Sequence, residues 1–414
     1  MATTHYESVP AVAADAEARG RDLVVMKFGG TSVGDTQKIK DVARRLVAAR
    51  ERGHRVVGVL SAMGDTTDDL IRLAHEVSPR PHPREYDLLV SVGERISNAL
   101  CAMAVHDLGH EAISLTGSQA GIVTDTTHGK AKIAEVRAQR INDALDREQI
   151  VLVAGFQGVS EEHEVTTLGR GGSDMTAAAL AAALGATVCE IYTDVEGVFT
   201  ADPRLVPGAR KLSALTYEEM LELSASGAKV LQLRSVEFAR NHDVRLHVRS
   251  TFTEAEGTWI VDEEDPVLEK AIISGVAHTD CEPLYRVREI DPAKLFARLA
   301  DAQVNVDTIL QVARDEIVFS APLEDSVATE EILDDLGVEW SSRDDLGKVA
   351  LVGAGMKSHP GIAAKTFATL ESAGIDSKVI STSPIKIACH IPTADVPRAV
   401  AALHDAFELE TAHA

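Results

Sequence analysis

Residues 24–32 read VVMKFGGTS, and this stretch decides the fold of the first part of the chain. Its apolar start predicts a short buried strand, and the glycine-rich run after it predicts a turn. A helix is expected next, because apolar residues recur on one face of a 3.6-residue repeat. These residues are Ile39, Val42, Ala43 and Leu46. Two glycines beside Lys27 let the backbone approach a phosphate and point N–H groups at it. An ordinary strand-to-helix turn fits the same run, and the Walker A spacing is absent.

Further apolar strands alternate with amphipathic helices. They are expected at residues 56–60, 112–115, 150–154 and 189–193. This alternation predicts an α/β fold, a mainly parallel sheet with helices on both faces in a three-layer αβα sandwich. Ligands of such sheets bind at the carboxyl ends of the strands. Polar, glycine-rich segments follow most of these strands, so a site is expected there.

The character of the chain changes at the acidic, turn-rich residues 252–265, where we expect a domain boundary. Beyond it, the order strand, helix, strand, strand, helix, strand occurs twice, which predicts two βαββαβ, ferredoxin-like domains. The second is expected to end in a short strand after residue 407. The predicted parts are a disordered extension (1–22), an α/β domain (23–262), and the two small domains (272–343 and 348–410).

Composition narrows the function classes. The 414 residues carry a formal net charge of −23, which disfavours nucleic acid and anionic membrane surfaces as partners. No apolar run appears long enough for a membrane span, and the first 22 residues lack the pattern of a secretory signal. Four separated cysteines suit reduced thiols rather than disulfides or a zinc site. A cytoplasmic protein is therefore expected.

Residues 167–174 read TLGRGGSD and form a second glycine-rich turn before a helix. Arg170 can hold a carboxylate in a bidentate fork, and Asp174 can bind a metal or orient Lys27. A helix cap explains Ser173 or Asp174 alone, but it does not explain the whole run. We therefore favour a functional role.

Two further segments carry weaker signals. Residues 193–204 read TDVEGVFTADPR and predict a long loop suited to the rim of a nucleotide site. Glu94 lies in a helical pattern and could pair with a substrate ammonium group. Taken by itself, this segment fits an exposed charge pair on the helix surface better than a substrate contact.

Together these segments resemble the amino-acid kinase family, and specifically the aspartate kinases. The similarity extends over residues 24–407. It includes SAMGDTT at 61–67, GERIS at 93–97, GFQG at 155–158 and GAKVL at 227–231. VGAGM at 352–356 and ISTS at 380–383 resemble the second ACT regulatory domain of such enzymes. The resemblance implies an amino-acid-kinase-like sandwich followed by two ACT-like domains.

The resemblance also implies roles. Lys27 and Asp174 are expected to be catalytic. The residues expected at ATP are Lys27, Gly29, Gly30, Ser61, Ser173, Thr193, Asp194, Phe199, Asp202, Arg204 and Lys229. Those expected at L-aspartate are Thr67, Glu94, Arg170, Gly171, Gly172 and Ser173. The implied reaction converts ATP and L-aspartate to ADP and 4-phospho-L-aspartate, the first step toward lysine, threonine, methionine and diaminopimelate.

The chemistry fits this set of residues. The side-chain carboxylate of aspartate has a pKa of about 4 and is already ionised at neutral pH, so it needs no general base. Catalysis then requires positioning of two anions and neutralisation of charge by cations, backbone N–H groups and Mg²⁺. No residues are expected to form a metal site of their own.

The predicted ACT-like domains depart from the family pattern. The second keeps a Pro-Gly loop at residues 359–361, but the first, which reads RVREIDPA at 286–293, has a shortened connection without glycine. Pro384 stands where related sequences have an acidic residue. Weakened or changed feedback by lysine and threonine is our hypothesis; drift of the loop around an intact pocket is the alternative. The effector-binding candidates are Asn305, Asp307, Gln311, Met356, His359, Pro360, Ser381 and Thr382.

A homo-oligomer paired through the ACT-like domains is expected from the same resemblance. Two other functions remain open at this point. The chain could phosphorylate another amino acid, or it could be a catalytically silent ACT-type regulator that binds amino acids.

Overall fold

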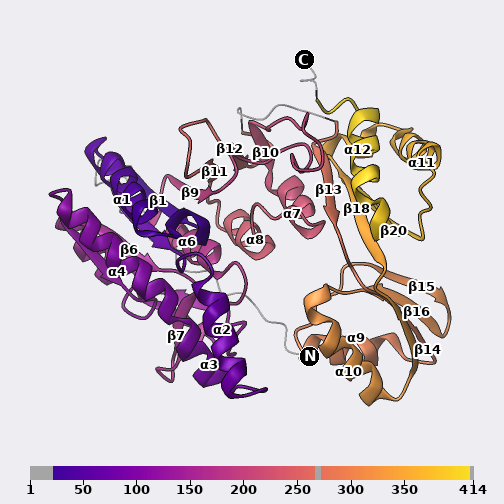
Figure 1. Cartoon of the computed structure of the whole chain (residues 1–414), viewed down its shortest axis with the longest axis horizontal. Coiled ribbons are helices and arrows are strands. Elements are labelled where there is room, and N and C mark those ends of the chain that lie inside the picture. The colour runs from indigo at the N-terminus through magenta and orange to yellow at the C-terminus, as the bar shows by residue number, and fades with distance from the viewer. Residues whose placement is uncertain (1–21, 266–271, 411–414) are drawn as a thin grey trace. The chain divides into compact units, whose positions relative to one another are not determined.

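The computed structural model describes residues 22–265 and 272–410, so nearly all of the predicted extension lies outside it (Figure 1). The chain forms two compact units. The first comprises Met1–Val198, Ser213–Tyr217 and Val230–Leu268, and the second comprises Phe199–Leu212, Glu218–Lys229 and Glu269–Ala414. The chain therefore passes between the units several times, whereas the sequence predicted one boundary.

An eight-stranded sheet organises the first unit. Its order is β10-β12-β11-β9-β1-β2-β6-β3, and only β11 and β12 pair antiparallel. The strands are β1 (Leu23–Phe28), β2 (Arg55–Leu60), β3 (Ala112–Leu115), β6 (Ile150–Ala154), β9 (Val188–Thr193), β10 (Ala214–Thr216), β11 (Leu246–Ser250) and β12 (Thr258–Val261). The predicted, mainly parallel sheet is confirmed.

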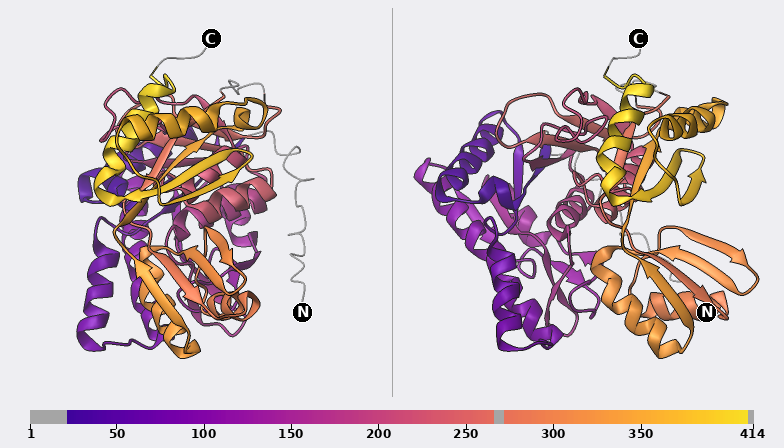
Figure 2. Two further views of the ribbon diagram at one scale, coloured as in Figure 1. Left: turned by 90° about the vertical axis from the view of Figure 1, so that its right-hand side faces the viewer. Right: turned by 45° about the vertical axis from the view of Figure 1, so that its right-hand side comes forward.

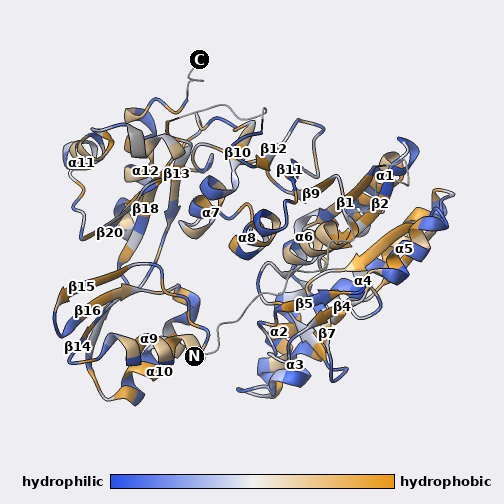
Figure 3. Ribbon diagram, turned by 180° about the vertical axis from the view of Figure 1, so that it is seen from behind, coloured by the Kyte–Doolittle hydropathy of each residue, from blue (hydrophilic) through white to orange (hydrophobic). Residues whose placement is uncertain are grey.

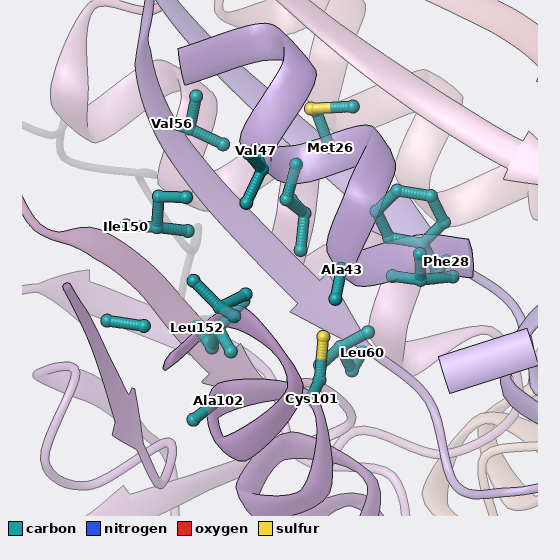
Figure 4. Packing of buried hydrophobic residues seen from close by; sticks show 14 of the residues in the cluster. Met26, Phe28, Ala43, Val47, Val56, Leu60, Cys101, Ala102, Ile150 and Leu152 are labelled. Atoms are coloured by element: carbon teal, nitrogen blue, oxygen red, sulfur yellow. The ribbon is translucent and has the colours of Figure 1, made fainter. Parts of the chain in front are cut away.

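The pleat of β1 assigns alternate side chains to opposite faces of this sheet. Met26 and Phe28 pack with helices α1 (Thr36–Glu51) and α4 (Val92–Asp107) in one buried cluster (Figure 4). Helix α6 (Gly172–Leu184) contacts β1, β2 and β9 and also packs on α8 (Leu233–Asn241). Figure 3 shows strongly hydrophobic strands, whereas helices such as α5 (Gln139–Asp146) and α8 carry both colours.

A smaller sheet, ordered β5-β4-β7-β8, completes the first unit. Its strands are β4 (Ile122–Thr124), β5 (Ile133–Val136), β7 (Gln157–Ser160) and β8 (Val165–Thr167). Helix α2 (Thr66–Val77) packs on α3 (Pro83–Val90), and α3 packs on β8. Strand β8 leads directly into the glycine-rich residues 167–172, so this sheet places the start of α6.

The stretch Pro83–Asp107, which contains α3 and α4, could cross a membrane by length and composition alone. The sequence analysis did not find it, because charged residues interrupt it. Its most apolar window is 56% buried inside the protein. The buried Asn98 amide donates hydrogen bonds to the carbonyls of Leu115 and Leu152 at 3.1 and 3.2 Å. Packing in the core therefore explains its apolar character.

The second unit contains two four-stranded antiparallel sheets, each with helices on one face (Figure 2). The first, ordered β15-β16-β14-β17, consists of β14 (Leu284–Arg288), β15 (Ile309–Ala313), β16 (Glu316–Ser320) and β17 (Glu339–Arg343) under α9 (Pro292–Asp301) and α10 (Ser326–Leu336). The second, ordered β13-β18-β20-β19, consists of β13 (Gly275–Thr279), β18 (Leu346–Val352), β19 (Val379–Ser383) and β20 (Lys386–Pro392) under α11 (Ile362–Ser372) and α12 (Val396–Ala406). Helix α7 (Tyr217–Ala225) precedes them in the chain.

Strand β13 corrects the predicted tandem arrangement. It lies in the range assigned to the first small domain, yet it pairs antiparallel with β18 of the second sheet. The short strand predicted after residue 407 is not formed up to residue 410, the last one described before the end of the chain. Strand β13 takes the position beside β18 that β17 takes beside β14. Val276 enters the core of the second sheet, which gives the physical reason for this pairing.

The loop Phe199–Leu212 was predicted to belong to the α/β domain, but it packs in the second unit. Ala201 and Val206 join the same buried cluster as Val276. The Val276 N–H donates to the Thr200 carbonyl at 2.8 Å, and Thr200 Oγ1 lies 2.9 Å from His404 Nε2 on α12. These contacts hold the loop against the second C-terminal sheet.

The position of β13 can be tested with two valines. Val276→Ala removes buried methyl groups from the core of the second sheet, at a cost of about 2 kcal/mol. Hydrogen exchange is expected to accelerate at the amides of β18 and β20 but not at those of β14. The matched change Val287→Ala, in the core of the first sheet, should show the reverse. Loss of protection in β14 on changing Val276 would contradict the observed topology.

Candidate active site

Lys27 and Asp174 form the central ion pair of the first unit. Lys27 is on β1, next to Phe28 and therefore on the opposite face of the strand, which places it toward α6. Its Nζ lies 2.5 Å from Asp174 Oδ1, and the two side chains are only 12% and 8% exposed. A buried ammonium group needs such a partner, because burial of an unpaired charge is costly.

The turn after β1 packs closely against the segment after β2. The Gly64 N–H donates to the Gly30 carbonyl at 3.1 Å, and the Ser61 N–H donates to the Phe28 carbonyl at 3.1 Å. A Cβ atom on Gly30 would lie 3.1 Å from the Ala62 carbonyl oxygen, so a side chain there would press on this segment. The strand ends of β1 and β2 thus bring Gly29, Gly30 and Ser61 together, and their role at ATP stays a prediction.

Glu94 lies in the first turn of α4, is 3% exposed, and faces the same segment. Its Oε1 accepts a hydrogen bond from the Ala62 N–H at 3.3 Å. Its Oε2 is buried with no hydrogen-bond partner in the described residues. Burial raises the pKa of this carboxyl to about 7. The exposed-charge-pair interpretation of Glu94 is therefore wrong, because the carboxylate is buried and half unsatisfied.

The start of α6 is built from glycines that tolerate unusual geometry. Gly171 is the N-cap with φ 74°, and Gly169 has φ 76°, both in the left-handed region. Ser173 packs so closely on the next loop that a Cβ on Gly155 would lie 2.6 Å from Ser173 Oγ. Arg170 lies exposed at the end of this turn. The turn therefore brings a cation, a hydroxyl group and the amino end of a helix beside Asp174.

Two side chains that the sequence analysis did not single out, the buried Asp87 and the partly buried Arg234, hold residues 167 and 168 at the start of the turn. Asp87 on α3 accepts hydrogen bonds from the Thr167 hydroxyl at 2.6 Å and the Thr167 N–H at 3.1 Å. Arg234 on α8 donates to the carbonyls of Leu168 and Ala131 at 2.9 and 3.2 Å. A carboxylate inside the apolar helical run PREYDLLV was the one available sequence signal for Asp87.

The other residues predicted to bind the nucleotide or L-aspartate are divided between the two units. Thr67 is half-buried near the start of α2, and the Thr193 hydroxyl donates to Asp194 at 3.1 Å at the end of β9, all in the first unit. Four predicted nucleotide residues belong to the second unit, and their role stays a prediction: Phe199, Asp202, Arg204 and Lys229. Arg204 pairs with Asp202 at 2.6 Å, and this contact lowers the pKa of the Asp202 carboxyl.

The predicted effector residues lie in strands β15 and β19 of the second unit and in the connections before β15 and after β18. The Asp307 carboxylate is already engaged in ion pairs, because Lys348 Nζ lies 2.6 Å and Lys386 Nζ lies 3.7 Å from it. His359 Nδ1 is 2.8 Å from the Gly355 carbonyl oxygen, and the side chain of Gln311 bonds back to its own turn at Arg314. Residues 289–291 alone connect β14 to α9, whereas residues 353–361 connect β18 to α11, which agrees with the predicted shortening.

Comparison with known proteins identifies families and structures that this chain resembles. Residues 22–250 match the model of the amino acid kinase family, and residues 349–407 match an ACT domain model. The aspartokinase of Mycolicibacterium smegmatis is 51% identical over 405 residues, covering 94% of this chain and 96% of that protein. Aspartokinase III of Escherichia coli in complex with aspartate and ADP (R-state) superposes with a TM-score of 0.82 at 25% identity, covering 93% of this chain and 99% of that one. The same enzyme with lysine and aspartate (T-state) gives a TM-score of 0.71.

The buried Glu94 carboxyl predicts a pH-dependent stability. Its pKa of about 7 in the folded protein exceeds the ordinary value of 4.5, so the folded state binds the proton more tightly than the unfolded state. Stability is therefore lost as pH rises from about 4.5 to about 7. Glu94→Gln should remove this loss. Between pH 5 and pH 8 the free energy of unfolding of the variant should therefore rise relative to that of the wild type by up to about 3 kcal/mol.

Urea unfolding at both pH values measures this gain, with Glu111→Gln, an exposed glutamate, as the control. An equal effect of both substitutions at the two pH values would show that Glu94 is not buried as described.

Proposed function

Because the chain belongs to the aspartokinases of the amino acid kinase family, we propose that it transfers the γ-phosphoryl group of ATP to the side-chain carboxylate of L-aspartate. The products are ADP and 4-phospho-L-aspartate. The observation that carries this proposal is the buried Lys27–Asp174 pair at the carboxyl end of the parallel sheet, with Glu94 and the start of α6 as neighbouring groups of the same unit. The chain is an ATP-dependent phosphotransferase, and the reaction would be the first committed step toward amino acids derived from aspartate.

In this proposal Glu94 and Arg170 recognise the two charged ends of the substrate amino acid. The unsatisfied Oε2 of Glu94 suits the ammonium group, which would also stabilise the ionised form of this carboxyl. Arg170 suits a carboxylate, which its guanidinium can hold through two parallel hydrogen bonds. Thr67, Ser173 and the N–H groups of Gly171 and Gly172 supply the remaining polar contacts. Binding of aspartate at about pH 6 to 7 should therefore release a proton from Glu94.

Lys27 and the turn after β1 are assigned to the phosphates. The Lys27 ammonium would stabilise the charge on the transferring group, and Gly29 and Gly30 would let the backbone approach it. Asp174 holds Lys27 in place from α6. Thr193 and Asp194 are assigned to the nucleotide at the end of β9. The aspartate carboxylate is already ionised, so no residue has to remove a proton from it.

Mg²⁺ is proposed to enter with ATP rather than to occupy a protein cage. No group of three His, Cys, Asp or Glu side chains that could hold a metal occurs in residues 22–265 and 272–410. Mg²⁺ commonly binds through one or two carboxylates together with substrate phosphates, and Asp174 is the carboxylate available beside Lys27. The ion would neutralise charge on the phosphate oxygens when bound.

A hydroxylamine-trap assay tests the reaction. Aspartyl hydroxamate is expected from Mg·ATP and L-aspartate but not from L-glutamate. Lys27→Met should lower kcat by about 100-fold or more, because it removes the cation beside the transferring group. The control Lys40→Met changes an exposed lysine of α1 and should leave kcat unchanged. Product formed from glutamate would indicate a kinase of another amino acid, and absence of both hydroxamate and ADP would indicate a silent regulator.

We further propose that the protein is a cytoplasmic homo-oligomer joined through the C-terminal sheets. Edge strands β15 and β19 carry exposed apolar side chains at Ile309, Val312 and Ile380. Exposed edge strands with apolar residues favour pairing with another chain.

Feedback by lysine and threonine is proposed to be weak. The carboxylate of Asp307 is engaged by Lys348 and Lys386, so an effector ammonium group would have to displace them. The shortened connection between β14 and α9 supports the same view.

Wild-type activity is therefore expected to stay above half in millimolar lysine plus threonine. Lys386→Met should increase the inhibition, because it removes one of the two cations at Asp307. Lys378→Met serves as control, since Lys378 pairs with Asp376 outside this cluster. Strong inhibition of the wild type would contradict the proposal, as would equal responses of the two variants.

A further inference from the structure

Asp87 is a fully buried carboxylate on α3, and in the described part of the chain its hydrogen-bond donors come from two segments of the first unit, residues 128–129 and Thr167 at the end of β8. Thr167 donates through its hydroxyl at 2.6 Å and its N–H at 3.1 Å. The Gly129 N–H lies 3.1 Å from each carboxylate oxygen, and His128 Nδ1 lies 2.7 Å from Oδ2. Both oxygens are thus satisfied by residues 128–129 and by Thr167.

These two segments also contact each other directly. The Ala131 N–H donates to the Thr167 carbonyl at 2.9 Å. A Cβ atom on Gly169 would lie 2.9 Å from the Gly129 carbonyl oxygen. Arg234 also links the two segments, because it donates hydrogen bonds to the carbonyls of Leu168 and Ala131. The backbone immediately before Arg170 is therefore fixed by an anion on α3 and by a cation on α8.

The donor set shows what the buried charge of Asp87 does. Removal of a carboxylate from water is costly unless hydrogen bonds replace its hydration. The bonds that do so are strong because the acceptor is ionised. They come from residues outside α3, so they tie α3 to residues 128–129 and to Thr167. Their effect is to order residues 128–129 and the start of the 167–172 turn.

We propose that Asp87 is a positioning residue for the recognition of aspartate. It fixes the backbone before Arg170 so that the guanidinium and the start of α6 meet the substrate in one geometry. This proposal rests on the proposed function, in which Arg170 holds a substrate carboxylate. Lys27 and the turn after β1 belong to other strands, so binding of ATP should depend little on Asp87.

Kinetics of four variants test the proposal. Asp87→Asn keeps the size of the side chain but removes acceptor capacity. It should raise KM for aspartate by about 10-fold or more and change KM for ATP by less than about twofold. Thr167→Val removes one donor and should act in the same direction, whereas Thr167→Ser keeps the hydroxyl and should restore the wild-type KM.

Thr166→Val is the matched control for a merely structural effect. Thr166 is also buried in β8, and its hydroxyl lies 2.6 Å from that of Thr124 rather than near Asp87. This variant should lower Tm without changing KM for aspartate. Equal increases in both KM values for Asp87→Asn would overturn the proposal, as would a lower Tm with unchanged kinetics.

Hydrogen exchange separates failure of this proposal from failure of the proposed function. If the wild type forms no aspartyl hydroxamate, the proposed function fails, but the loop contacts can still be measured. Asp87→Asn should then accelerate exchange at amides 168–172, and Thr166→Val should not. Unchanged exchange in Asp87→Asn would show that Asp87 does not hold this turn.

Discussion

The ammonium group of Lys27 is the constraint on which the site depends. It projects from a central strand of a sheet that helices cover on both faces, and the Lys27 side chain is only 12% exposed. An anion from the covering helix must therefore lie beside it, and Asp174 of α6 does so at 2.5 Å. That requirement fixes where α6 begins, and hence the course of the glycine-rich turn before it.

The turn itself is held from outside the site. Its glycines allow left-handed backbone and close approach, but glycine also leaves the chain free to move. Asp87, which is buried, and Arg234, which is partly buried, compensate for this freedom with charge-assisted hydrogen bonds. Glu94 shows the opposite arrangement, since one of its oxygens stays unsatisfied in the described residues. The Asp87 carboxylate, which supports the turn, thus has hydrogen-bond partners at both oxygens, whereas the Glu94 carboxylate, which is assigned to the substrate, has a partner at only one oxygen in the described residues.

A second buried charge cluster joins the two C-terminal sheets. Lys348 of β18 lies 2.6 Å from both Glu282 and Asp307, and its side chain is 1% exposed. Burial would raise the pKa of Glu282, but His390 and Lys348 outweigh it and lower that pKa to about 2. Glu282 and Lys348 therefore stay ionised at neutral pH, and Lys348 of the second sheet pairs with Asp307, which precedes β15 of the first sheet. The chain connects the same two sheets, because β14 to β17 of the first sheet lie between β13 and β18 of the second. The chain therefore leaves the second sheet after β13 and returns to it at β18.

The sequence by itself determined the mainly parallel sheet, the two glycine-rich turns and the likeness to aspartokinases, because pleat periodicity and turn chemistry are local properties. Lys27, Arg170 and Asp174 were singled out as site residues from the same local signals. Only the tertiary structure decided the place of β13, the burial of Glu94, and the engagement of Asp307. Strand partners and charge partners come from distant parts of the chain, and local patterns do not encode which of them meet. Asp87 is an example, since the role proposed for it depends on hydrogen bonds from Gly129 and Thr167, which are distant from it in the sequence.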